Sequence, residues 1–112
     1  MYKIKFTNVL KNTNILGITI FPFIFLSSNR KNKDNSILIN HERIHTVQQL
    51  ELLIIPFFIL YFLNYIINLF KYGFNHWKAY YYIIFEQEAY NNEDNLDYLK
   101  DRKPFNYLRE NK

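Results

Sequence analysis

The sequence contains no cysteine. This absence excludes disulfides, a thiolate nucleophile and zinc sites built from cysteine. Any metal bound by this chain must therefore use histidine and carboxylate ligands. The chain offers three histidines and ten acidic residues from which such a site can be made.

The chain also lacks internal repeats and a strong excess of either charge. Its formal net charge is +4, and its basic cluster of Arg30, Lys31 and Lys33 carries neither a known binding motif nor aromatic side chains for stacking. A solvated loop explains this cluster better than a phosphate-binding patch, so we expect no nucleic-acid partner. With 112 residues, we expect a single domain (residues 1–112) with one functional site.

A cleavable signal peptide is not expected at the N-terminus. Lys3 and Lys5 are followed by a polar interruption, residues 8–14, before the first apolar run, and no small-residue cleavage site follows. We therefore expect the protein in the cytoplasm or at the inner membrane, as a peripheral or an integral protein.

The apolar part of the composition predicts a folded core rich in large rings. Hydrophobic residues make up 49% of the chain and aromatic residues 20%. Residues 15–27 form a predicted strand region, because Gly17 to Leu26 is rich in β-branched and aromatic residues and a Ser-Ser-Asn turn follows. Pro22 cannot donate to a ladder, so this strand should lie at a sheet edge or be broken into two pieces.

Two helices are predicted in the middle of the chain. Residues 36–51 contain neither glycine nor proline and predict a helix that begins near Asn35 or Ser36. Residues 52–70, Leu52 to Phe70, carry no charge and reach the length of roughly 18 residues at which a helix can span a membrane. Pro56 and the amides of Asn64 and Asn68 favour a helix in the core or at a membrane interface over a spanning helix.

A third helix is predicted for residues 77–91, after Gly73 ends the hydrophobic helix. Residues 92–112 form a polar tail, whose candidate docking anchors are Leu96, Tyr98, Leu99, Phe105, Tyr107 and Leu108. These elements predict an α+β, mainly helical fold, with a short edge strand or hairpin and three main helices.

The residues from His41 to His45 form an H-E-x-x-H signature inside the predicted helix 36–51. Two histidines four residues apart lie on one helix face, where both imidazoles can reach one zinc ion. Glu42 lies beside them and can take a proton from an attacking water and pass it to a leaving amine. The pattern predicts one Zn²⁺ with Glu42 as general base; the alternative is a surface helix with a chance match.

A catalytic zinc needs a third protein ligand and an open position. The remaining candidates are His76 and two carboxylates in an apolar helical segment, Glu86 and Glu88, and carboxylate is the better candidate. Glu86 and Tyr90 share one helix face, whereas Glu88 points about 200° away from Glu86.

Other polar residues near the signature are candidates for supporting contacts. Gln48 and Gln49 follow His45 and either support the ligands or are solvated. His76 precedes Trp77 at a helix start, where capping or packing explains it as well as catalysis does. The candidates for stabilising an oxyanion are Tyr80, Tyr81, Tyr82 and Tyr90.

The signature resembles that of the gluzincin metallopeptidases, in which H-E-x-x-H on one helix is completed by a glutamate from a later helix. The segment FEQEAY is similar to the E-x-E-A-D segment of the membrane-associated heat-shock and CaaX-processing zinc peptidases. The resemblance implies a minimal zincin-like domain with Glu86, three residues before Ala89, as third ligand, and Glu88 as the alternative. The aspartate that supports the ligands in those peptidases is Tyr90 here.

The strings LINHERIH and AYYYIIFEQEAYNNE also resemble a family of short, uncharacterised bacterial proteins, most familiar from the Bacteroidota. We expect a zinc metallopeptidase, a hydrolase, that acts on a peptide or protein substrate. Zincins lay an extended substrate along an edge strand, a role open to residues 17–26. The alternatives are a small membrane-attached binding protein that contacts lipid through Leu52 to Phe70, and a zinc-binding protein without protease activity.

Overall fold

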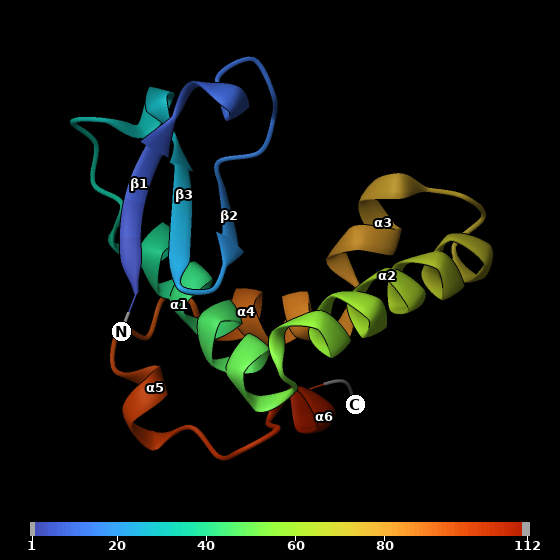
Figure 1. Cartoon of the computed structure of the whole chain (residues 1–112). Coiled ribbons are helices and arrows are strands. Elements are labelled where there is room, and N and C mark those ends of the chain that lie inside the picture. Colours follow the sequence, from blue (N-terminus) through green and yellow to red (C-terminus); the bar gives the residue numbers. More distant parts are fainter. Residues whose placement is uncertain (1, 111–112) are drawn as a thin grey trace.

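The computed structural model describes residues 2–110 and has the predicted α+β, mainly helical architecture. A small sheet lies at one end, and the helices lie below and beside it (Figure 1). The strands are β1 (Lys3–Thr7), β2 (Gly17–Ile20) and β3 (Phe23–Ser27), with 3-10 turns η1 (Asn8–Leu10) and η2 (Ser28–Arg30). The helices are α1 (Ser36–Glu51), α2 (Ile54–Lys71), α3 (His76–Tyr81), α4 (Ile84–Asn92), α5 (Tyr98–Asp101) and α6 (Tyr107–Glu110).

The sheet has the order β1-β3-β2, so β3 is its central strand. β3 runs parallel to β1 and antiparallel to β2, with Thr19 opposite Ile24. The predicted strand region 15–27 is thus a hairpin broken at Pro22, whose peptide bond with Phe21 is cis. β1 was not predicted, because most of its side chains are exposed and its alternation is weak. The hairpin leaves β2 as an edge strand next to α1.

Helix α1 coincides with the predicted helix 36–51 and lies between the sheet and α4. Its central residue Ile44 is completely buried in a cluster with Ala89 of α4 and Tyr98 of α5. Most of the buried residues of α1 are polar, among them His41 and His45. Buried polar side chains need hydrogen-bond partners, and the partners of His41 and His45 form the candidate site.

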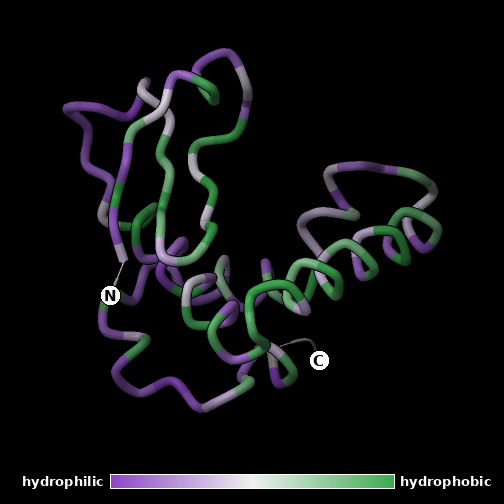
Figure 2. The backbone as a smooth tube through the Cα atoms, in the orientation of Figure 1, coloured by the Kyte–Doolittle hydropathy of each residue, from purple (hydrophilic) through white to green (hydrophobic). Residues whose placement is uncertain are grey.

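Helix α2 projects away from the sheet, and α3 folds back alongside it (Figure 1). Pro56 lies in its first turn, where a missing N–H costs little. Phe57 and Asn68 are the buried residues of α2, and apolar residues run along its length (Figure 2). It is long and apolar enough to cross a membrane, with a mean hydropathy of 1.7, and the described chain buries 11% of it. The prediction of a core helix is therefore wrong for the described chain, and interfacial and spanning positions stay predictions.

The predicted helix 77–91 is two helices, α3 and α4, separated at Tyr82 and Ile83. The prediction of one uninterrupted helix was wrong for two physical reasons. Aromatic and β-branched residues crowd the preceding turn and have low helix propensity. In addition, Asn64 of α2 binds the N–H of Ile84 and begins the second helix there.

The tail beyond α4 forms two short helices that pack against the rest of the chain. Of the predicted anchors, Tyr98 and Tyr107 are buried and Leu99 is half-buried, whereas Leu96, Phe105 and Leu108 are exposed. Tyr107 packs against Phe85 in the second core cluster, which also contains Phe57 of α2. The two anchoring tyrosines therefore hold the tail against α1 and α4.

Candidate metal centre

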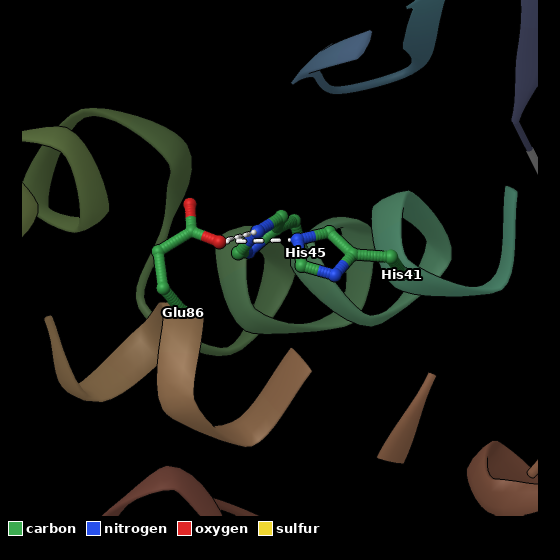
Figure 3. A group of neighbouring side chains, drawn as sticks. All are labelled: His41, His45 and Glu86. Carbon is green, nitrogen blue, oxygen red and sulfur yellow. Dashed lines mark hydrogen bonds and ion pairs between the residues drawn. The ribbon is translucent and has the colours of Figure 1, made fainter. Parts of the chain in front are cut away.

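Among the described residues, one group has the composition and spacing to hold a metal ion: His41, His45 and Glu86. Their candidate ligand atoms lie within 4.8 Å of one another. Oε1 of Glu86 lies 3.0 Å from Nε2 of His41 and 3.1 Å from Nε2 of His45. Figure 3 shows both imidazoles on α1 turned toward the carboxylate of α4. The sequence placed all three residues in one site, and the structure brings them together.

The outer nitrogen of each imidazole also faces a polar partner. Nδ1 of His45 lies 2.8 Å from Oε1 of Gln48, and Nδ1 of His41 lies 3.6 Å from Oε2 of Glu93. Such contacts fix the ring orientation of a ligating histidine and leave the inner nitrogen as the donor atom. Both rings are thus held with Nε2 directed at Glu86.

Burial and charge act in opposite directions on the two coupled residues of the cluster. Burial alone would lower the pKa of His45, but the adjacent Glu86 carboxylate outweighs it and raises the pKa to about 9. Burial would raise the pKa of Glu86, but the imidazoles of His45 and His41 hold that pKa well below its usual range. In the metal-free protein, a proton on His45 therefore compensates the buried carboxylate.

Two tyrosines complete the surroundings of the Glu86 carboxylate. The hydroxyl of Tyr61 on α2 donates to Oε2 of Glu86 over 2.6 Å. Burial raises the pKa of both Tyr61 and Tyr80, and the nearby Glu86 carboxylate raises both further. Both hydroxyls are therefore protonated at neutral pH and available as hydrogen-bond donors.

Glu42 lies against the edge strand beside the histidine pair. Its Oε1 accepts a hydrogen bond of 2.7 Å from the hydroxyl of Thr19 on β2. Gly17 begins the same strand, where a Cβ would meet the Leu26 side chain of β3 at 3.0 Å, the Phe25 carbonyl at 3.3 Å and Cγ of Glu42 at 3.5 Å. The general-base candidate is thus held by a hydroxyl from the neighbouring strand.

A cleft of about 740 Å³ lies over these residues. One wall is formed by β2 and the segment before it, and the other by side chains of α2 and α3. Glu42, His41, His45 and Glu86 all line it, as do the apolar side chains Ile18, Leu38, Phe57, Phe58 and Trp77. The candidate centre therefore opens into a mainly apolar space beside an edge strand.

Glu88, the alternative ligand, lies away from the histidine pair. It is completely buried and pairs with Arg102 of the tail, and it also accepts a hydrogen bond from Gln48. The structure therefore places Glu86 at the cluster and Glu88 behind Gln48, as the opposite directions of their side chains on a helix predict.

The other supporting candidates have separate places. The ring of Tyr90 packs edge-on against His41 with centroids 4.5 Å apart, and its hydroxyl lies 3.1 Å from that of Tyr80. Gln49 binds the backbone of the hairpin through Phe21 N and Thr19 O, each at 2.8 Å. His76 is exposed at the cleft wall, where its Nδ1 lies 2.7 Å from the Tyr65 hydroxyl. These residues frame the centre without joining the cluster.

Sequence reasoning missed Thr19, Tyr61 and Glu93. Thr19 and Tyr61 reach the site from elements whose packing no local pattern reveals. Glu93 lies one helical turn beyond Ala89 and seven residues after Glu86, so it falls on the same face of a continuous helix. That spacing was the one available signal.

The donor set fits a divalent transition metal. Two imidazole nitrogens and one carboxylate oxygen form the three-ligand set of many catalytic zinc sites, and each of the three residues is at most 5% exposed. The same donors also accept other first-row divalent ions. The chain matches no protein-family model, no curated protein and no solved structure. Any functional assignment therefore rests on these residues and their geometry.

Proposed function

We propose that the protein is a zinc-dependent metallopeptidase in which His41, His45 and Glu86 hold the ion and Glu42 is the general base. The observation that carries the proposal is the convergence of three buried donors from two helices at a cleft that Glu42 also lines. When bound, the ion would supply Lewis-acid activation of the attacking water and the scissile carbonyl.

Glu42 supplies the proton transfers of the proposed reaction. Glu42 lines the cleft together with His41 and His45, and there its carboxylate would take the proton of the attacking water and deliver it to the leaving amine. The Thr19 hydroxyl occupies one lone pair of Oε1 and holds the carboxylate in place. The remaining acceptor positions are available to the water.

The walls of the cleft fit an extended, mainly apolar peptide. β2 is an edge strand, and the Gln49 amide already binds Thr19 O and Phe21 N beside it. A substrate backbone would therefore pair by strand addition with the part of β2 around Gly17 and Ile18. The apolar side chains of the cleft would bury alternate substrate side chains, as an extended chain presents them. We propose a peptide or protein segment in an extended conformation as the substrate.

The isosteric substitution Glu42→Gln tests the proposed reaction. It removes the base but retains an acceptor for Thr19, so we expect cleavage of unfolded protein substrates to fall by a factor of about 10² to 10⁴ while zinc stays bound. Asp34→Asn is the control, since Asp34 lines the same cleft without contacting the cluster. Cleavage by zinc-loaded Glu42→Gln at the wild-type rate contradicts the role of Glu42. A zinc-loaded wild-type protein without any cleavage favours a zinc-binding protein that is not a protease.

We also propose that α2 contacts a lipid membrane. Its exposed apolar residues include Ile55, Ile59, Phe62, Leu63, Ile67 and Phe70, each at least half exposed. No charge interrupts residues 52–70, and Lys71 follows at the end of the helix, where a lysine can reach lipid phosphates. Lipid contact would cover an apolar surface that the described chain leaves open.

A further inference from the structure

A buried chain of polar contacts joins His45 to the C-terminal tail. It begins at Gln48, which is completely buried one turn after His45 on α1. Oε1 of Gln48 lies 2.8 Å from Nδ1 of His45. Nε2 of Gln48 donates to the Phe85 carbonyl at 3.0 Å and to Oε1 of Glu88 at 2.9 Å. The amide of Gln48 thus lies between the metal cluster and α4.

The orientation of the Gln48 amide follows from its partners. The Phe85 carbonyl accepts hydrogen bonds and cannot donate them, and the Glu88 carboxylate is paired with the Arg102 guanidinium, so both require the NH₂ group of Gln48. The amide oxygen must then face His45. Because an amide oxygen can only accept, Nδ1 of His45 carries a hydrogen, and its Nε2 is left as the metal-donor atom.

Glu88 is in turn held by two residues of the tail. The hydroxyl of Tyr98 donates to Oε2 of Glu88 at 2.6 Å. Arg102 donates to the same carboxylate through Nε at 2.5 Å and through Nη2 at 3.1 Å. Together with Gln48, these donors occupy both oxygens of Glu88, so the carboxylate has a single arrangement.

Arg102 is itself fixed by a second carboxylate. Its Nη1 and Nη2 each donate to Glu51 at the end of α1 over 2.9 Å. The Arg102 side chain is 4% exposed, although it comes from a polar tail. A guanidinium is suited to this place because its planar fork can serve two carboxylates at once.

We propose that Arg102, Glu88 and Gln48 are positioning residues of the metal centre, so that the C-terminal tail selects the metal-binding tautomer of His45. The proposal rests on the metal cluster of the proposed function but not on peptidase activity. Arg102 fixes Glu88, Glu88 fixes the amide of Gln48, and the amide oxygen keeps the hydrogen on Nδ1. The tail therefore contributes to metal affinity without contacting the metal.

A double-mutant cycle on zinc affinity tests this coupling. Arg102→Gln removes the fork, and Gln48→Leu removes the amide through which Arg102 would act. We expect Arg102→Gln to weaken zinc binding by about 10- to 100-fold in the wild-type background, as losses of such supporting contacts do. In the Gln48→Leu background, the same substitution should weaken it less than about twofold. Zinc affinity is measured by competition with a chelator, and Co²⁺ absorption spectra report any change of ligand geometry.

Leu99→Ala is the matched control. Leu99 lies in α5, three residues before Arg102, and packs against the Ile44 cluster, but it has no part in the polar chain. We expect it to lower the melting temperature while zinc affinity and the Co²⁺ spectrum stay at wild-type values. This control separates loosening of the tail from loss of the tautomer-selecting contacts.

Each outcome decides the proposal. An unchanged zinc affinity in Arg102→Gln, or an equal loss in both backgrounds, overturns it. If Arg102→Gln does not fold, Tyr98→Phe takes its place in the cycle, because it removes one donor to Glu88 and keeps the aromatic ring. Tyr98→Phe should weaken zinc binding less than the loss expected for Arg102→Gln. It should do so in the wild-type background and not in the Gln48→Leu background. A wild-type protein that binds zinc without cleaving peptides refutes the peptidase and leaves this test intact.

Discussion

Oδ1 of Asn64 on α2 accepts a hydrogen bond of 2.8 Å from the backbone N–H of Ile84, two residues before the metal-ligand candidate Glu86. The first N–H groups of a helix have no partner within the helix, and a side-chain oxygen that binds one of them stabilises the helix start. The apolar helix α2 therefore sets where α4 begins. The start of α4 in turn sets where Glu86 meets the histidines of α1.

Replacing Asn64 by alanine removes the hydrogen bond to the Ile84 N–H at the start of α4. We expect the free energy of unfolding to fall by about 1 kcal/mol and zinc affinity to fall severalfold, because Glu86 loses its fixed position. Asn64→Asp retains an acceptor oxygen and should keep most of both. Chemical denaturation and chelator competition measure the two quantities. If Asn64→Ala bound zinc with wild-type affinity, the hydrogen bond between Asn64 and Ile84 would not be what positions Glu86.

The pKa of His45 predicts how zinc binding depends on pH. Burial would lower this pKa, but Glu86 raises it from 6.5 to about 9, so His45 is protonated at neutral pH in the metal-free protein. Zinc requires the neutral imidazole and must displace the proton. We expect the Kd for zinc to fall by about tenfold per pH unit between pH 7 and pH 9 and then to level off. Calorimetry in two buffers at pH 7 should detect the released proton, and a pH-independent Kd would contradict this account.

The same shift predicts the stability of the metal-free protein. A group with a raised pKa in the folded state stabilises the fold fully below its unfolded pKa, here 6.5, and loses that contribution as the pH rises through about 9. We expect the melting temperature of the metal-free protein to fall across this interval. The zinc-loaded protein, in which the proton is already displaced, serves as the comparison and should not show that fall.

The hydrogen bond from Thr19 to Glu42 predicts a defect in catalysis rather than in metal binding. Thr19→Val removes the hydroxyl and keeps the shape, so kcat should fall by about tenfold, since a hydrogen bond to a charged group contributes about 1.5 kcal/mol. Thr46→Val is the control, because the Thr46 hydroxyl binds the backbone carbonyl of Glu42 and not its carboxylate. A lower zinc content in Thr19→Val, with kcat per bound zinc unchanged, would contradict the assigned role.

Lipid contact through α2 predicts a sharp effect of polar substitutions on its exposed face. Phe62 and Ile67 are 61% and 62% exposed, so replacing both by serine should leave the fold intact and release the protein from lipid vesicles. Val9→Ser is the control, since Val9 is 83% exposed and lies far from α2 in the sequence. Wild-type protein that resists carbonate extraction spans the membrane, and protein that is extracted but floats with vesicles is interfacial. Failure of the wild type to float with vesicles refutes lipid contact.

Local sequence patterns were sufficient for the parts of the fold that depend on neighbouring residues. Helix α1 has the predicted bounds 36–51, with its start next to the predicted cap residue Asn35, and the hairpin breaks at Pro22. The four-residue spacing of His41 and His45 predicted that they share one helix face, because that depends on local helix geometry alone. Glu86 depended on its resemblance to a known segment and on its helix face.

Long-range contacts determined what the sequence did not reveal. The break between α3 and α4 depends on Asn64, and the position of Glu42 depends on Thr19, which lies 23 residues earlier. Arg102 was assigned to a polar tail, because nothing near it in the sequence indicates that two carboxylates of other helices would bury it. The burial of an apolar helix also depends on how the rest of the chain packs, and the described chain leaves most of α2 exposed.

The most direct test of the central claim is the metal content of purified protein. If His41, His45 and Glu86 form one site, the wild-type chain should carry close to one zinc ion, measured by elemental analysis after dialysis against trace zinc. His41→Ala and His45→Ala should each lose it, while His76→Ala, which changes the histidine outside the cluster, should retain it. A full zinc load in both His41→Ala and His45→Ala would contradict the assignment.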